Sequence, residues 1–337
     1  MAKTAVVAEM SKTQRVRAAL AGEPVDRVPV SLWGHDYLRE WSPQELVAAT
    51  LEQYRAHDWD FIKFNPRASY FAEAWGSVYE PATATESRSA RRVSSAVNSL
   101  AELAALSPVD PRGGVFGEHL RALRLLLAEV GAEVDVVHTI FSPLSVVAGL
   151  CGAAPQFLQY AADDPAASHH ALAVATATLA GYAKAALEAG ASGIFFAPLA
   201  WASRDTCSED FYREFGRPYD LQLLAGIREA DFNILHVCRD HNMVDLLLDY
   251  PVAAVNWAAH GEGNPDLGAL KGRTGMAVMG GIDHARLDEM SSDEVASQAL
   301  EALTAGPRRL FVSAGCSISP ATPEANRAAV VVAARGA

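Results

Sequence analysis

Cysteine is scarce in this sequence, with four residues among 337, too few and too scattered for a disulfide framework. We therefore expect a reducing compartment, the cytoplasm. No uninterrupted apolar run is long enough to span a bilayer, and the stretch from Met1 to Lys12 lacks the apolar core of a signal peptide. Basic residues are also fewer than acidic ones, with 28 Lys and Arg against 40 Asp and Glu. This balance argues against nucleic acid as the main partner, because phosphate binding needs clustered Lys and Arg.

The sequence does contain short apolar runs that alternate with longer amphipathic stretches, a pattern typical of repeated β-α units around a parallel sheet. The candidate strands are Val28 to Leu32, Phe61 to Phe64, Val134 to Ile140, Gly193 to Ala197, Asn233 to Leu235, Ala253 to Asn256, Ala277 to Gly280 and Leu310 to Ala314. The amphipathic stretches include Pro43 to Ala56, Pro165 to Gly190, Ser208 to Ala230 and Ser292 to Ala305. Eight strands with helical crossovers predict an α/β fold, a (β/α)8 TIM barrel. Nucleotide-binding folds lose support, because no G-x-G-x-x-G or P-loop motif follows any strand.

The connection between the second and third strands is longer than most of the others. It runs from about Asn65 to Glu133 and contains the Ser- and Arg-rich stretch Thr83 to Ser95, followed by two helical patterns. The chain has no linker rich in Gly or Ser and no convincing internal repeat. We therefore interpret residues 65–133 as an elaborated excursion within one domain that spans residues 1–337.

Three potential metal ligands follow two of the predicted strands. His236-Val237-Cys238 comes directly after the run that ends at Leu235, and Cys316 follows the run that ends at Ala314. Residues i and i+2 at a strand end point to the same side, so His236 and Cys238 are placed to bind one ion. An imidazole and two thiolates form the ligand set of a zinc ion with one open position. The spacing leaves open the alternative that these side chains simply pack in the interior.

Barrel enzymes place their chemistry on the loops that follow the strands, and polar and aromatic residues of this chain gather there. We predict substrate contacts from Trp33, His35, Asp36, Tyr37, Asn65, Phe141, Asn256 and Asp283. Several of these have a structural alternative: Trp33 and Tyr37 as packing at the rim, His35 and Asp36 as a solvated turn, and Asp283 as a helix cap. Cys151 and Cys207 lie in or near helical stretches, where a structural role is expected.

Several segments spread over the chain resemble the uroporphyrinogen decarboxylase superfamily of barrels. They are Arg15 to Leu20, Asp26 to Val30, Gly193 to Ala197, Ser208 to Phe211, Arg217 to Tyr219, Gly280 to Asp283 and Thr322 to Asn326. The resemblance covers nearly the whole chain and implies the fold of that superfamily. The chain departs from the superfamily at one motif that bears on its activity. True decarboxylases bind the carboxylates of a porphyrinogen with an Arg-rich motif of the form R-Q-A-G-R just after strand one, where this chain has Trp33-Gly34-His35-Asp36-Tyr37 and no arginine until Arg39.

The other branch of the superfamily comprises the zinc methyltransferases that move methyl groups between corrinoid proteins and thiols such as coenzyme M. Cobalamin-independent methionine synthase is a more distant relative with similar metal chemistry. Their H-x-C…C ligands carry over to His236, Cys238 and Cys316. In some relatives a carboxylate beyond the next strand supplies another ligand; the matching stretch here offers His260 and Glu262, of which we favour His260. Many relatives also have glycine after H-x-C, where this chain has Arg239.

The resemblance therefore implies a zinc-dependent methyltransferase in which His236, Cys238 and Cys316 hold the ion and are the catalytic residues. A free thiol, with a pKa of about 8.5, is mostly protonated at neutral pH, and coordination to zinc makes it the reactive thiolate. No corrinoid-binding domain is evident, so the corrinoid would arrive on a partner protein. Two alternatives stay open: a metal-free decarboxylase of a carboxylated substrate and a non-catalytic ligand-binding barrel. The family also implies a monomer or a homodimer.

Overall fold

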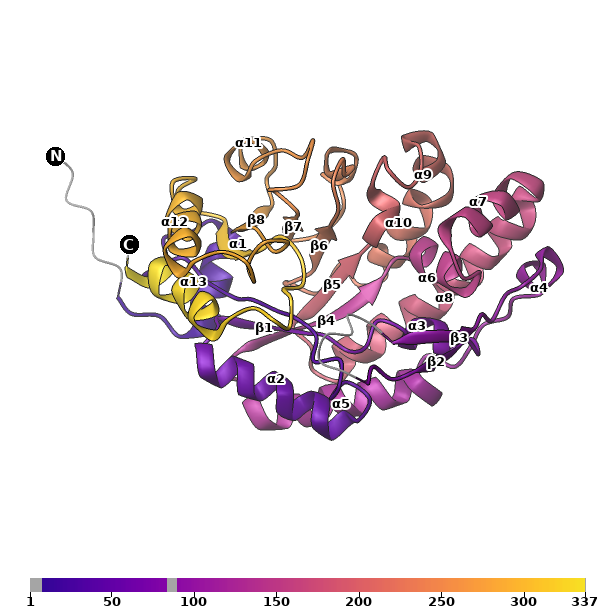
Figure 1. Cartoon of the computed structure of the whole chain (residues 1–337), viewed down its shortest axis with the longest axis horizontal. Helices are drawn as coiled ribbons and strands as arrows, with labels where there is room; N and C mark the ends of the chain where they lie inside the picture. Colours follow the sequence, from indigo (N-terminus) through magenta and orange to yellow (C-terminus); the bar gives the residue numbers. More distant parts are fainter. Residues whose placement is uncertain (1–7, 84–89, 337) are drawn as a thin grey trace.

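The computed structural model describes residues 8–83 and 90–336, and a curled parallel sheet of seven strands lies at its centre (Figure 1). The strands are β1 (Phe61–Phe64), β4 (Asp135–Phe141), β5 (Gly193–Ala197), β6 (Ile234–Val237), β7 (Ala254–Trp257), β8 (Ala277–Ile282) and β9 (Leu310–Ala314). They neighbour one another in chain order, and every pair is parallel. Seven of the eight predicted strands are thus confirmed within the described residues, and the curled sheet fits a TIM-like fold.

The predicted first strand, Val28 to Leu32, is not a strand but lies between the two edges of the sheet. Val30 forms an isolated parallel bridge with Val312 of β9. On the other side, its carbonyl oxygen accepts a hydrogen bond of 2.9 Å from the N–H of Asp60, directly before β1. A regular ladder fails here for two reasons. Pro29 has no N–H, and the N–H of Val30 donates to the Asp60 carboxylate at 2.8 Å instead of to a backbone carbonyl.

Helices surround the sheet, as Figure 1 shows. The helices before β4 are α1 (Lys12–Ala21), α2 (Pro43–His57), α3 (Tyr70–Glu73), α4 (Leu100–Ala104) and α5 (Gly114–Val130). Those after β4 are α6 (Pro143–Leu150), α7 (Ala154–Asp163), α8 (Pro165–Glu188), α9 (Glu209–Phe215), α10 (Arg217–Ala225), α11 (Leu267–Lys271), α12 (Ser292–Leu303) and α13 (Glu324–Gly336). Single 3-10 turns occupy Leu199–Ala202 and Val244–Leu247.

Local sequence explains where these helices begin and end. Ser291 caps α12 and forms a capping box with Glu294, which satisfies backbone N–H groups at the start of the helix. The single helical stretch predicted from Ser208 to Ala230 is instead two helices, α9 and α10, which meet at Gly216. Pro218 gives the physical reason, because proline has no N–H to donate and fits the first turn of a new helix better than the interior of an old one.

The chain between β1 and β4 contains α3, α4, α5 and a two-stranded antiparallel sheet of β2 (Val78–Glu80) and β3 (Arg91–Ser94). This small sheet was not predicted. Residues 84–89 of the Ser- and Arg-rich stretch lie outside the described residues. Both strands are largely exposed, so the apolar alternation by which strands are recognised in a sequence is missing from them.

The apolar side chains form an inner and an outer cluster in the part of the chain that the structure describes. The inner cluster fills the interior of the curled sheet and is rich in aromatic rings, among them Trp33, Phe61, Phe195, Phe232 and Phe311. The outer, larger cluster packs the sheet against the helices. The interior below the strand ends is therefore a packed core and not a channel. No helix among the described residues combines the length and the apolar character that crossing a membrane would need.

Candidate metal centre

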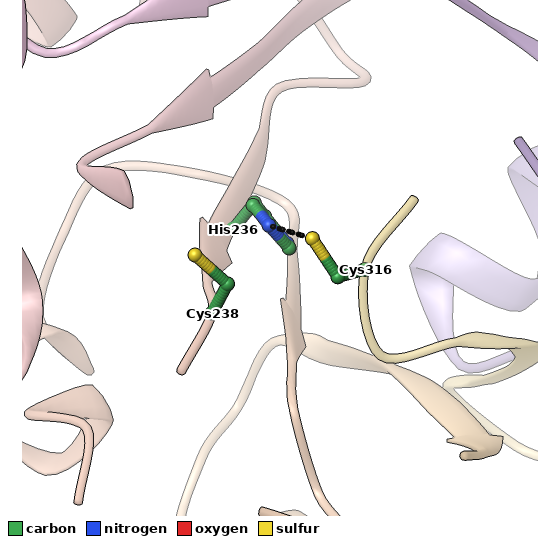
Figure 2. Close-up of side chains that lie close together, drawn as sticks. All are labelled: His236, Cys238 and Cys316. Atoms are coloured by element: carbon green, nitrogen blue, oxygen red, sulfur yellow. Dashed lines mark hydrogen bonds between the residues drawn. The ribbon is translucent and has the colours of Figure 1, made fainter. Parts of the chain in front are cut away.

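His236, Cys238 and Cys316 converge at the carboxyl ends of the strands. His236 belongs to β6, Cys238 follows β6 directly, and Cys316 lies two residues beyond the end of β9. One ligand atom of each lies within 4.8 Å of those of the other two. Figure 2 shows the imidazole of His236 between the two sulfur atoms, with the sulfur of Cys316 directed at Nε2. His236 and Cys238 are buried and Cys316 is partly exposed, so the group has one side open to a ligand.

The geometry of this group fits a tetrahedral ion. With zinc–sulfur bonds near 2.3 Å and zinc–nitrogen bonds near 2.0 Å, two ligand atoms of a tetrahedral centre are separated by about 3.5 to 3.8 Å. The observed distance from Cys316 Sγ to His236 Nε2 is 3.4 Å. Only small side-chain rotations are needed for all three atoms to bind one ion. One nitrogen and two sulfurs are also the donor set that zinc prefers, so the residues present fit this metal.

Asn256 fixes the orientation of the His236 ring. Its Oδ1 lies 2.6 Å from His236 Nδ1, while its Nδ2 donates to the carbonyl oxygens of Met279 at 3.1 Å and Ala314 at 3.0 Å. Because the amide NH2 group is committed to these carbonyls, the oxygen must face the imidazole. Nδ1 therefore carries a proton, and Nε2 is the ring nitrogen that faces the sulfur of Cys316. Asn256 is fully buried, so the structure gives it this positioning role and not the predicted substrate contact.

The two thiols of the group are electrostatically coupled. A hydrogen bond between them lowers the pKa of Cys316 well below its ordinary value and raises the pKa of Cys238 well above it. Burial opposes ionisation of Cys316, whereas the neighbouring His236 favours it. One proton is thus held on Cys238 and shared with the sulfur of Cys316. A group that already carries a thiolate is prepared to receive a cation.

The thiols of Cys151 and Cys207 have raised pKa values, in contrast to the lowered pKa of Cys316. Burial raises the pKa of Cys151 to about 12 and that of Cys207 to about 11. The sulfur of Cys207 lies 3.3 Å from the carbonyl oxygen of Trp201. Neither belongs to the group of His236, Cys238 and Cys316, which among the described residues could hold a metal ion. Their surroundings fit the structural role expected from the sequence.

The structure does not bring the predicted fourth ligand, His260, to the group. Its Nε2 lies 3.1 Å from the carbonyl oxygen of Gly281, to which an imidazole N–H donates. Glu262 is also directed elsewhere: its carboxylate is strongly exposed and faces His241 at 3.8 Å. Within the described residues, neither joins His236, Cys238 and Cys316. The turn after β7 directs both side chains away, which sequence spacing alone does not reveal.

Two residues near the group were not among the predicted site residues. His284, after β8, places its Nδ1 3.2 Å from the position that a Cβ on Gly315 would take, next to Cys316. Burial lowers the pKa of His284, which favours a neutral imidazole there. Lys63, in the middle of β1, is buried, and burial lowers its pKa to about 7, while the nearby Cys316 acts in the opposite direction. A lysine inside the apolar run Phe61–Phe64 was the sequence signal for this second residue.

The other predicted substrate residues gather around two neighbouring cavities. A cavity of about 450 Å³ is lined by Trp33, His35, Asp36, Tyr37, Lys63 and Asn65, among others, and its wall includes Ile318, two residues beyond Cys316. A second cavity, of about 360 Å³, shares His35 and Tyr37 with the first and adds Phe141. Asp283 lines neither among the described residues. Its Oδ1 accepts from the N–H of Ala285 at 3.0 Å in a local turn, which differs from the helix cap named as its structural alternative.

Inside these cavities the predicted residues are held in fixed positions. His35 Nδ1 lies 2.8 Å from the carboxylate of the buried Glu40, and the ring of His35 stacks on Tyr37 with 5.0 Å between centroids. Trp33 is buried among the inner aromatic rings, and Asn65 Nδ2 donates to the carbonyl oxygen of Gly34 at 3.0 Å. The walls of these two cavities are therefore partly aromatic, with a few ordered polar groups, as expected of a small-molecule site.

Comparison with known proteins identifies the family. The sequence model named "Uroporphyrinogen decarboxylase (URO-D)" matches residues 11–337. The chain belongs to the uroporphyrinogen decarboxylase family. The family predicted from the sequence is thereby confirmed.

Two curated relatives of this URO-D family member are methyltransferases. The chain is 25% identical over 350 residues to the "Methylcobamide:CoM methyltransferase MtaA" of Methanosarcina barkeri, which covers 97% of this chain and 98% of the relative. It is 26% identical over 237 residues to the "Methylcobamide:CoM methyltransferase MtbA" of Methanosarcina mazei, over 66% of this chain and 64% of the relative. These relatives come from the branch that the motifs indicated.

Solved structures show the same fold. A methyltransferase from Methanosarcina mazei superposes with a TM-score of 0.79 at 22% identity, covering 97% of this chain and 98% of that one. A B12-independent methionine synthase from Shewanella sp. W3-18-1 gives a TM-score of 0.58 at 15% identity, with 87% and 86% covered. At these identities the likeness shows the fold, while the activity has to be argued from the site.

Proposed function

We propose that this protein is a zinc-dependent methyltransferase that moves a methyl group between a corrinoid and a small thiol. The observation that carries the proposal is the convergence of His236, Cys238 and Cys316 at the strand ends, with their ligand atoms within 4.8 Å. The named activities of the MtaA and MtbA relatives support it. In this proposal the three residues are both the metal ligands and the catalytic residues.

The chain's own residues would hold the ion and leave room for a ligand. His236, fixed by Asn256, offers the lone pair of Nε2, and the two sulfurs complete a three-ligand set. A zinc ion bound there would supply an open coordination position and would lower the pKa of a bound thiol to give the thiolate. Two cysteine ligands offset the charge of the ion, which would leave a bound thiolate electron-rich. The partly exposed Cys316 lies on the side from which the thiol would enter.

The corrinoid is proposed to arrive on a separate protein, because the URO-D match accounts for residues 11–337 themselves. On this view residues 1–337 form a single URO-D-like barrel domain, in which residues 65–133 are an elaborated connection. We place the protein in the cytoplasm, where the thiols of the centre stay reduced. A homodimer is compatible with this proposal but is not required by it.

The proposal is tested by metal analysis together with a methyl-transfer assay. Wild-type protein is expected to contain about one zinc per chain, as a single three-ligand site requires. It is also expected to methylate at least one member of a panel of small thiols from methylcobalamin. Cys238→Ser and Cys316→Ser should lose both metal and transfer. Cys207→Ala, a buried cysteine outside the group, is the matched control and should keep both.

The same experiment separates the alternatives. A metal-free decarboxylase would contain no zinc and would lose no activity when Cys238 or Cys316 is replaced. A ligand-binding barrel without catalysis would bind zinc or thiol but show no turnover with methylcobalamin. Wild-type protein that neither contains zinc nor binds added zinc would refute the methyltransferase proposal.

A further inference from the structure

Asp220 of α10 is an acid whose side chain is completely buried. Its Oδ2 accepts hydrogen bonds from the hydroxyl of Tyr212 at 2.5 Å and from that of Tyr250 at 2.9 Å. Its Oδ1 is buried without a hydrogen-bond partner among the described residues. Arg217, on the same helix, pairs with Asp249 instead, at 2.5 Å. The carboxyl group therefore has two neutral donors on one oxygen and a bare second oxygen.

This carboxyl group joins three parts of the chain at the amino-terminal face of the barrel. Tyr212 belongs to α9, and Asp220 lies in the first turn of α10. Tyr250 follows the 3-10 turn Val244–Leu247 and precedes β7 by four residues. Tyr250 also lines a cavity of about 410 Å³, whose wall includes Ala253, directly before β7. Water can therefore approach the network from the face opposite to the metal-binding group.

Ionisation of Asp220 would place a negative charge in the interior without a paired cation, which is costly. Burial is the largest effect on this group and raises the pKa of Asp220 to about 7. The hydroxyls of Tyr212 and Tyr250 act in the opposite direction, and so does the positive charge of Arg217.

These three side chains are the ionisable groups that face the carboxyl group from the elements around it. The helix α6, which also packs against α10, contains no ionisable side chain. Other ionisable side chains on the neighbouring helices have contacts of their own or are exposed, among them His169 and Lys184 of α8 and Glu209, Asp210, Arg213 and Glu214 of α9. The protonation of Asp220 is thus decided inside a small, closed network.

We propose that the folded protein holds Asp220 in its neutral form and that loss of this proton to water releases Tyr250, a pH-sensitive latch at the amino-terminal face of the barrel. In the neutral form Oδ2 is a carbonyl oxygen, whose two lone pairs accept from both hydroxyls. In the ionised form the charge is shared with Oδ1, which has no donor, and entry of water beside Tyr250 offsets its cost. The latch is independent of the proposed methyl transfer.

Infrared spectroscopy of the full chain tests the protonation state. At pH 6, wild type is expected to show the carbonyl stretch of a buried, protonated carboxyl group, and this band should be lost as the pH is raised to 8. Asp220→Asn should lack the band, whereas Asp210→Asn, an exposed acid of α9, should keep it. Absence of the band from wild type at pH 6, or its presence in Asp220→Asn, would overturn the proposal.

Hydrogen exchange of peptides that contain Tyr250 tests the release. Opening exposes Asp220 to water, where its pKa is about 3.9, so opening should become easier as the pH rises toward 7 and should change little above it. After correction for the intrinsic effect of pH, exchange in wild type should be at least about 10-fold faster at pH 8 than at pH 5. Asp220→Asn should exchange equally at both pH values. Equal exchange in wild type would contradict the latch.

Tyr250→Phe provides a second variant in case Asp220→Asn does not fold. It removes one donor that stabilises the ionised carboxylate, so the loss of the infrared band should move to higher pH. A band that is lost at the same pH as in wild type, or at lower pH, would show that Tyr250 does not hold this carboxyl group and would refute the proposal.

Discussion

The Nδ1 atom of His236 lies 2.6 Å from Oδ1 of Asn256, and Asn256 is in turn held by carbonyl oxygens of β8 and β9. This relationship ties the orientation of one ligand to two strands that are far from it in sequence. The imidazole is thus fixed before any metal arrives, which reduces the reorganisation that binding requires.

Replacing Asn256 should weaken metal binding without removing a ligand. Asn256→Ala leaves Nδ1 of His236 without its acceptor and is expected to lower zinc affinity by about 10- to 100-fold. Competition with a chelator of known affinity measures the change. Ser313→Ala removes a buried hydroxyl that also contacts Asn256, at 3.3 Å, and serves as the control with a smaller expected effect. An affinity unchanged in Asn256→Ala would mean that the ring is oriented by packing alone.

Asp60 is expected to be essential for joining residues 28–32 to the rest of the sheet. Its carboxylate is fully buried and accepts from Arg15 at 2.8 Å, from Arg27 at 2.6 Å and from the N–H of Val30 at 2.8 Å. Asp60→Asn leaves two guanidinium groups without their shared anion and should lower the free energy of unfolding by about 3–5 kcal/mol. Denaturant titration measures this loss. The control Asp231→Asn removes an exposed partner of Arg17 and should cost less than about 1 kcal/mol.

Gly281 and Gly76 have almost the same φ, so alanine at each position allows the cost of backbone strain to be measured apart from the cost of overpacking. Gly281 has a φ of 104° and Gly76 a φ of 101°. A Cβ at Gly281 would lie 2.3 Å from the Cβ of Ala302 on α12, whereas nothing lies within 4 Å of one at Gly76. Alanine at either position costs about 1–2 kcal/mol of backbone strain. Gly281→Ala should cost a further 1–3 kcal/mol, roughly, for overpacking. Equal losses in thermal unfolding would show that α12 moves away at little cost.

His138 should make stability depend on pH in the acid range. Burial, with a smaller contribution from Lys63, lowers its pKa to about 3. Because this lies below the pKa of about 6.5 of an unfolded chain, its contribution is fully present above pH 6.5. It is lost as the pH falls toward 3, by about 1.4 kcal/mol per pH unit. His138→Gln should reduce the slope of unfolding free energy against pH by this amount, and the control His170→Gln, on an exposed position of α8, should not. A wild-type slope in His138→Gln would contradict this account.

Much of the fold could be predicted because strands buried on both faces leave a simple apolar signature, as in Gly193 to Ala197. The convergence of His236, Cys238 and Cys316 was predictable for a related reason: they lie at the ends of such strands, and parallel strands bring their carboxyl ends to one rim. The structural elements that were missed depend on contacts distant in sequence. Val28 to Leu32 looks like a strand until Pro29 and the Asp60 carboxylate are considered together.

The site residues that were predicted wrongly or missed are those whose side-chain direction the sequence does not reveal. Asn256 belongs to β7 and His260 follows it. Asn256 holds the ring of His236, whereas His260 faces the carbonyl oxygen of Gly281. The spacing of residues in the sequence cannot predict these two side-chain directions, because the conformation of the turn after β7 determines them. Arg239 illustrates the same point, since its φ of 74° lies in the left-handed region that favours glycine, the residue that many relatives have after H-x-C. Lys63 was overlooked because a single polar residue in an apolar run does not show, from sequence alone, that its side chain is buried.

The ligands of the centre come from β6 and from beyond β9, with β7 and β8 between them in the sheet. A bound ion would therefore act as a removable cross-link between positions 80 residues apart. Any ion that binds only the folded chain also shifts the unfolding equilibrium in favour of the native state. The lifetime of this protein against proteolysis would then rise and fall with the metal supply of the cell.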